Sequence, residues 1–231
     1  MKKYYGLSGK KQPEPLDKFI HENYISEPFD NGSFLEMGAM NGIRFSNTKF
    51  FEDNMGFNQG VLIEPQPHMF EKLKLNRPNC ECFNLAIHSE KKSVEFISNK
   101  SRDWSGCVNH DESEKHIQAF HSGKQKDNNS YTETIPADRL DSILQKSKLK
   151  YIDFWSLDVE GSELQCLNSM DWSIPVGLIC VENSSHPEEI HDIISNNGLT
   201  LIQQRGSDGF YFNFNYFRKN LFCNKIFDIK R

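Results

Sequence analysis

The sequence predicts an α/β domain built on a doubly wound, mostly parallel β-sheet. From Ser33 to Ala86, short apolar runs alternate with segments whose apolar residues recur at helical spacing. This alternation is typical of βαβ units. Several of the apolar runs end in an acidic residue shortly before a turn, as Tyr151–Asp158 does before Gly161. Ligands bind at the carboxyl ends of the strands in open α/β sheets, so these acids mark the expected ligand-binding edge.

The composition narrows the class of protein further. The 231 residues are enough for one domain with a sizeable core, and 37% are hydrophobic, with 18 phenylalanines. A formal net charge of -5 argues against a general nucleic-acid binder. No apolar stretch reaches the roughly 18 residues of a membrane span, and no secretory signal follows Lys2 and Lys3. The six cysteines fit no zinc pattern, and we expect no metal. Because no secretory signal is recognised, we expect a reduced, cytoplasmic protein.

We expect residues 1–231 to form a single domain, with residues 1–15 as a mobile lead-in. The first half of the chain then predicts alternating elements, each from its apolar spacing and its turn residues. They are a helix at Leu16–Ile25, a strand at Ser33–Glu36, a helix at Asn47–Met55, a strand at Val61–Glu64, a helix at Met69–Asn76, and strands at Cys82–Ala86 and Ser93–Ser98.

A polar insert at residues 99–133 interrupts this pattern. It is rich in serine, asparagine, lysine and aspartate, with one helical segment expected at Glu114–Phe120. Loops of this length in compact domains are usually lids, binding loops or disordered segments, so we expect it to be a lid over an acceptor. Trp104, next to Arg102, is suited either to stacking on a sugar or to anchoring the loop.

The second half of the chain returns to regular elements. A buried strand leads to Asp158, and a helix begins at Ser162. The strand Val176–Glu182 and the helix Pro187–Asn196 follow, and Gly198 is a suitable helix stop. Two further strands, Leu199–Gln204 and Gly209–Phe214, are predicted to form a closing antiparallel hairpin.

A glycine turn marks the first part of the expected site. Gly38, Ala39 and Gly42 follow the strand that ends at Glu36, and such small residues let the backbone approach a ligand closely. An ordinary strand-to-helix turn would use the same residues, and Glu36 is either a solvated acid or a ligand contact. Glu64 ends the next strand, at about the 20-residue distance that suits the two hydroxyls of an adenosine ribose. The turn is not the dinucleotide fingerprint G-x-G-x-x-G, which disfavours an oxidoreductase.

Two acids mark the second part of the site. Asp158 and Glu160 are two residues apart at a strand end, so we expect both side chains to face one crevice. They suit a general base, metal ligands or, for Glu160, a group that favours the start of the next helix. Glu182 ends the following strand and faces either the same crevice or a salt-bridge partner. His186 comes next and is a candidate catalytic histidine, whereas the spacing of His116 and His121 does not favour a metal cluster.

Four sequence blocks together resemble the FkbM-type family of methyltransferases. They are F-L-E-M-G-A-M-N-G, L-I-E-P-Q-P-H-M-F-E-K-L, N-L-A-I and L-D-V-E-G-S-E-L, in this order and at matching spacing. The resemblance implies a seven-strand Rossmann-like sheet with one antiparallel edge strand, and S-adenosylmethionine as the methyl donor. It also implies donor contacts, which are Glu36, Gly38, Ala39, Asn41 and Gly42 in the turn, Glu64 at the ribose, and Asn84, Ala86 and Ile87 at the adenine.

The expected activity is therefore O-methyl transfer from S-adenosylmethionine to a sugar hydroxyl of a glycan, polysaccharide or nucleotide sugar. Asp158, Glu160 and His186 are the expected catalytic residues, and Trp104 and Glu182 the expected acceptor contacts. The chain departs from the family in its long insert and in Ser156, where many relatives carry a lysine. Two alternatives stay open, namely a non-catalytic binding protein that keeps the fold and a nucleotide-cofactor oxidoreductase.

Overall fold

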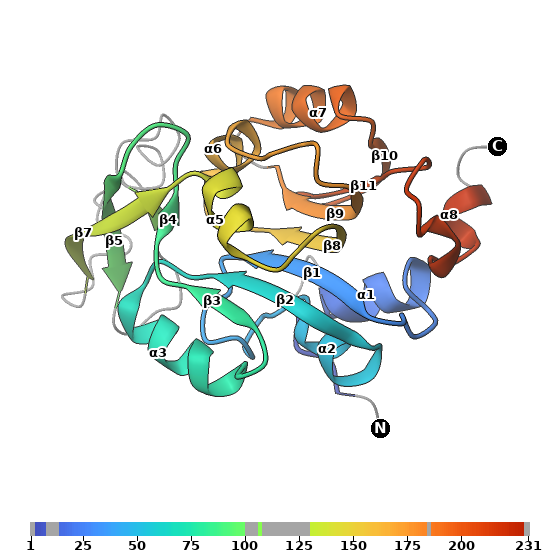
Figure 1. The fold of residues 1–231 in the computed structure, drawn as a ribbon, viewed down its shortest axis with the longest axis horizontal. Coiled ribbons are helices and arrows are strands. Elements are labelled where there is room, and N and C mark those ends of the chain that lie inside the picture. The colour runs from blue at the N-terminus through green and yellow to red at the C-terminus, as the bar shows by residue number, and fades with distance from the viewer. Residues whose placement is uncertain (1–2, 8–13, 100–105, 108–129, 184–185, 229–231) are drawn as a thin grey trace.

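The computed structural model describes residues 3–7, 14–99, 106–107, 130–183 and 186–228. Its centre is a seven-stranded sheet in the order β10-β11-β9-β8-β1-β2-β3 (Figure 1). The strands are β1 (Gly32–Met37), β2 (Phe57–Ile63), β3 (Glu81–Phe83), β8 (Ile152–Leu157), β9 (Val176–Glu182), β10 (Thr200–Arg205) and β11 (Asp208–Phe212).

The directions of the strands confirm the predicted fold class. The five strands from β9 to β3 are parallel to one another. The antiparallel part lies at one edge, where β11 pairs antiparallel with both β9 and β10. This edge is the closing hairpin that the sequence predicts.

Helices cover both faces of the sheet (Figure 1). On one face lie α1 (Leu16–Asn23), α2 (Lys49–Asn54), α3 (Pro67–Asn76) and α8 (Lys225–Asp228), which follows a short 3₁₀ turn at Lys219–Leu221. On the other lie α5 (Leu140–Lys146), α6 (Glu163–Asn168) and α7 (Pro187–Asn196). Both α3 and α7 begin with proline, whose fixed φ suits the first helical turn. Among the described helices, all are too short or too polar to cross a bilayer.

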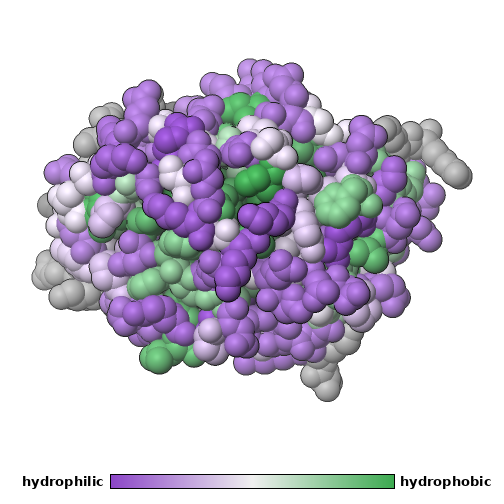
Figure 2. All heavy atoms as spheres, viewed as in Figure 1, coloured by the Kyte–Doolittle hydropathy of each residue, from purple (hydrophilic) through white to green (hydrophobic). Residues whose placement is uncertain are grey.

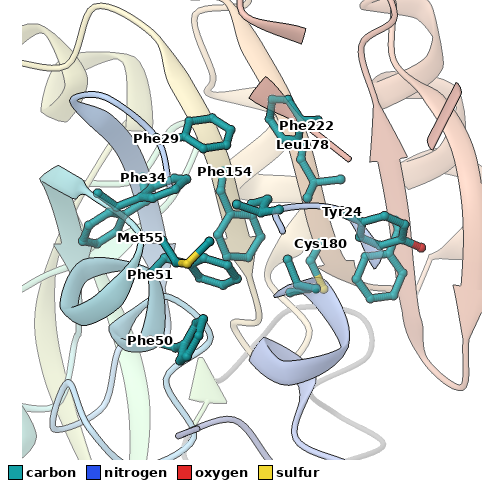
Figure 3. Close-up of a cluster of buried hydrophobic side chains, with 14 of the residues drawn as sticks. Tyr24, Phe29, Phe34, Phe50, Phe51, Met55, Phe154, Leu178, Cys180 and Phe222 are labelled. Carbon is teal, nitrogen blue, oxygen red and sulfur yellow. The ribbon is translucent and has the colours of Figure 1, made fainter. Parts of the chain in front are cut away.

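The central strands are buried on both sides because their side chains alternate between two apolar cores. Phe34 and Phe154 point into the first core, and their neighbours Leu35 and Trp155 point into the second. Figure 3 shows how aromatic rings dominate the first core. Continuous apolar strands of this kind are expected where helices cover both faces of a parallel sheet, which is why the sequence reveals them clearly.

A second, four-stranded sheet was not predicted. It has the order β4-β7-β5-β6 and consists of β4 (Ala86–Ile87), β5 (Ser93–Asn99), β6 (Gly106–Cys107) and β7 (Ser130–Asp138). The single strand expected at Cys82–Ala86 is therefore wrong, because the chain leaves the main sheet after Phe83 and joins the second sheet at Ala86.

Along the chain, the polar insert runs from the end of β5 into the start of β7, and β6 falls within it. Asn99 and Ser130 are opposite each other at the end of the antiparallel β5–β7 ladder, so the last four residues of the expected insert belong to β7. The helix expected at Glu114–Phe120, together with Trp104, lies outside the described residues.

Part of the expected lead-in packs against the first core. Tyr4 stacks on Phe50 with ring centroids 4.4 Å apart. The backbone N–H groups of Tyr5 and Gly6 donate to the buried carboxylate of Asp17 at 2.7 and 3.1 Å.

The outer surface is mostly hydrophilic on the face that Figure 2 shows.

Candidate functional site

A cavity of about 340 Å³ lies at the carboxyl ends of the central parallel strands. Its size falls within the range of small-ligand sites, roughly 300–1,000 Å³, and its position is the one that the strand-end acids predict. Residues at or just beyond the ends of four neighbouring strands contribute to its wall: Met37 and Gly38 at the end of β1, Ile63 and Glu64 at the end of β2, Asp158 after β8, and Glu182 of β9.

Gly38 lets two strand ends come together beside the cavity. It has φ +78, and a Cβ at this position would lie 1.9 Å from the carbonyl oxygen of Asp158. The amides of Gly38 and Ala39 both donate to the carbonyl of Ile63 at 3.1 Å. The turn therefore ties the ends of β1, β2 and β8 to one another, and only glycine fits there.

Two other residues of the turn, Asn41 and Gly42, stabilise the turn and its packing and do not line the cavity. A Cβ on Gly42 would meet the side chains of Arg77 and Leu73 at 2.6 Å, so this glycine allows close packing on the α3 side. The Oδ1 atom of Asn41 accepts from the amides of Ile43 and Arg44 and holds the turn itself. Ala39, Asn41 and Gly42 are not among the residues that line the cavity.

Glu36 is buried, so its interpretation as a solvated acid is wrong. Its carboxylate accepts from the hydroxyls of Ser46 and Thr48 at 2.9 and 2.7 Å and from the Asn47 amide at 2.8 Å. Arg77 adds a charged contact at 3.4 Å. Glu36 lines the cavity, but its main contacts hold the polar segment that leads into α2.

Glu64 links the glycine turn to the end of β2. One carboxylate oxygen accepts from the Met40 amide at 2.7 Å and the other from the Gln66 amide at 2.8 Å. Burial raises the pKa of Glu64 to about 7, against the lowering effect of these two hydrogen bonds. Each oxygen keeps a further lone pair, so the carboxylate can still accept from the hydroxyls of a ribose.

An apolar wall lies beside Glu64. Ile63, Pro65, Leu85, Ala86 and Ile87 line it, together with Phe96 from the second sheet. Such a wall suits a flat aromatic ring. Asn84 does not line the cavity; instead its Nδ2 donates to the carbonyls of Glu64 and Pro65 at 2.8 and 2.9 Å and fixes the edge of this wall.

The acidic part of the site differs from the predicted geometry. β8 ends at Leu157, before Asp158, and Glu160 has a left-handed φ of +54. The two acids are therefore not aligned as neighbours on an extended strand, although both line the cavity. A different set of three acids lies close together: carboxylate oxygens of Asp158, Glu163 and Glu182 are all within 4.8 Å of one another.

The close acids disfavour ionisation of Asp158. The surrounding protein limits its hydration even though the side chain borders the open cavity, and Glu182, Glu160, Glu163 and Asp208 add like charge. Both effects raise the pKa of Asp158 well above its usual value, with the loss of hydration as the larger one.

Glu163 is the member of this trio that the sequence did not reveal. It is buried, and its Oε1 accepts from the amides of Val159 and Gly161 at 3.1 and 3.2 Å. Burial raises its pKa to about 7. The trio can thus hold a proton near neutral pH, and carboxylate oxygens are also ligands of hard cations.

A comparison with protein-family models matches residues 36–207 to the methyltransferase FkbM domain. The chain belongs to the FkbM family of methyltransferases. Members of this family use S-adenosylmethionine as the methyl donor. The matched region of the FkbM domain runs from Glu36 to Ser207 and includes the glycine turn, Glu64, Asp158 and Glu182.

Solved structures of methyltransferases are distantly similar to this FkbM chain. TrmK of M. capricolum, in complex with S-adenosylhomocysteine, has 7% identity and a TM-score of 0.44 over 92% of this chain and 71% of its own. An O-methyltransferase from Bacillus cereus, also in complex with S-adenosylhomocysteine, has 12% identity and a TM-score of 0.36 over 85% and 76%. Similarity this distant says nothing about the acceptor. A comparison with curated proteins gave no match.

The structure places the remaining predicted residues as follows. His186 precedes α7, with its Nδ1 3.8 Å from Glu189, and it is not among the residues that line the cavity. Trp104 lies outside the described residues. Several residues line the cavity without having been predicted to do so: Leu7, Asn47, Ser156, Ser162, Ser207 and Asp208. For Asn47 a signal was present, since Ser46-Asn47-Thr48 is a run of hydrogen-bonding residues before a helix.

Proposed function

We propose that this FkbM methyltransferase transfers a methyl group from S-adenosylmethionine to a sugar hydroxyl. The observation that carries the proposal is Asp158, a carboxylate with a raised pKa that shares one cavity with the Gly38 turn and Glu64. A hydroxyl needs a base as its oxygen forms the new bond, and a carboxylate with a raised pKa is a stronger base than an ordinary one.

The residues of the cavity fit the proposed donor. The apolar wall of Leu85, Ala86 and Ile87 suits the adenine, and Glu64 suits the ribose hydroxyls. Acidic residues on the opposite side favour a cationic centre. When bound, S-adenosylmethionine supplies a methyl group on a positively charged sulfur. Asp158 would then accept the proton that the acceptor hydroxyl loses.

The acceptor side of the cavity favours a neutral, hydroxyl-rich molecule. Glu160, Glu182 and Asp208 line it, and carboxylates accept hydrogen bonds from hydroxyl groups. The same carboxylates would repel the diphosphate of a nucleotide sugar. Among the acceptors expected from the sequence, a neutral glycan or polysaccharide therefore fits best.

A panel of acceptors tests this function. Purified protein is incubated with isotope-labelled S-adenosylmethionine and with neutral oligosaccharides, nucleotide sugars or simple amines. Mass spectrometry should find the label on a hydroxyl oxygen of a neutral oligosaccharide. Label on an amine and on none of the sugars would show that the protein is an N-methyltransferase.

A further inference from the structure

The side-chain oxygen of Asn47 is a buried hydrogen-bond acceptor, beside the cavity, that has no partner among the described residues. Its side chain is more than nine-tenths buried and lines the cavity wall. The Nδ2 atom donates to the Ser156 hydroxyl at 3.0 Å, whereas Oδ1 has no hydrogen-bond partner within the part of the chain that the structure describes. A buried carboxamide oxygen without a partner is unfavourable, so this atom marks a place where a bound group would be stabilised.

The position of Asn47 is fixed by the two central strands. Its backbone N–H donates to Glu36 at 2.8 Å, and its side chain contacts Ser156. Glu36 and Ser156 are register partners on β1 and β8. Asn47 therefore lies at the junction of these two strands. The residues that it contacts, Glu36 and Ser156, precede Gly38 and Asp158 by two positions.

This position indicates which part of the donor Asn47 meets. In the proposed donor site, Glu64 would hold the ribose near the end of β2, and the methyl group would face Asp158 near the end of β8. The amino-acid end of S-adenosylmethionine is attached to the same sulfur as the methyl group. It would therefore lie near the junction of β1 and β8, where Asn47 is found. A carboxamide both donates and accepts hydrogen bonds, which suits a group that carries an ammonium and a carboxylate.

We propose that Asn47 binds the α-amino acid end of S-adenosylmethionine and that Glu36 positions it. This proposal rests on the donor site of the proposed function. It also changes the role expected for Glu36, whose carboxylate is occupied by Ser46, Asn47 and Thr48 and acts on the donor through Asn47.

Calorimetry with two ligands tests the proposal. S-adenosylhomocysteine has the amino-acid end, whereas 5′-methylthioadenosine has the adenosine and sulfur without it. Asn47→Leu in the full chain should weaken S-adenosylhomocysteine binding by about tenfold or more, the range for a hydrogen bond to a charged group. Binding of 5′-methylthioadenosine should stay within about twofold of wild type, since both proteins make the same contacts to it.

Two controls keep the result specific. Asn54→Leu changes the same residue type at an exposed position of α2 and should leave both affinities unchanged. If Asn47→Leu does not fold, Asn47→Ala is measured in the same way. Equal loss of both ligands, or loss of neither, would overturn the role of Asn47. A wild-type protein that binds neither ligand would instead refute the proposed donor site itself.

Discussion

At the scale of single residues, the proposed chemistry depends on how neighbouring acids change the pKa of one carboxylate, that of Asp158. Asp158 shares the cavity with Glu182 and Glu160, and a carboxylate oxygen of Glu163 lies within 4.8 Å of those of Asp158 and Glu182. These neighbours make the ionised form of Asp158 less favourable and its basicity greater. The rate of proton removal should therefore depend on pH through this group of acids rather than through a histidine.

Glu182→Gln should shift the pH profile of the reaction. In the proposed mechanism turnover requires ionised Asp158, so we expect it to fall as the pH drops through the apparent pKa of the acid group. Removing the charge of Glu182 lowers the pKa of Asp158, and the acid limb of kcat/KM should move to lower pH. Glu189→Gln, an exposed acid on α7, is the control and should leave the profile unchanged. An unshifted limb in Glu182→Gln would exclude electrostatic tuning by Glu182.

At the scale of secondary-structure elements, two connections shape the cavity. The glycine turn brings the end of β1 against the end of β8, and Arg77 joins the end of α3 to the segment before α2. Each connection is made by one residue, Gly38 or Arg77, so each can be tested by one substitution.

Gly38→Ala should destabilise the protein far more than Gly198→Ala. Both glycines have a positive φ, of +78 and +86, so alanine is strained at either position, by about 1–2 kcal/mol. Nothing lies within 4 Å of a Cβ on Gly198, whereas the Asp158 carbonyl lies 1.9 Å from a Cβ on Gly38. Denaturant unfolding should reveal the extra loss at Gly38. Equal losses would mean that the close approach of the two strands is not required.

Arg77→Met should remove about 3–5 kcal/mol of unfolding free energy, the usual result of leaving buried charges without their partner. The Arg77 side chain is fully buried and contacts the carboxylates of Glu36 and Glu52, the carbonyl of Gly42 and the hydroxyls of Ser46 and Thr48. Lys72→Met, at an exposed position of α3, is the matched control. Similar unfolding free energies for both variants would contradict a stabilising role for the Arg77 cluster.

At the scale of the whole molecule, the sequence predicts the main sheet because its strands are apolar on both faces and end in recognisable turns. The same logic finds the cavity, since Gly38, Glu64 and Asp158 all follow such strands. The second sheet was missed because β5 and β7 pair across a long insert, and local patterns do not report that pairing. Glu163 was missed because its approach to Asp158 depends on the left-handed backbone at Glu160 and Gly161.

The central claim is that Asp158 removes the proton of the acceptor hydroxyl, and Asp158→Asn tests it most directly. Asparagine keeps the shape of the side chain and removes its charge and basicity. Donor affinity and turnover are measured on one preparation, by calorimetry and by methyl transfer to the acceptor found in the panel. We predict nearly unchanged donor affinity and a fall in turnover of about 10²-fold or more. Wild-type values for both quantities would contradict it.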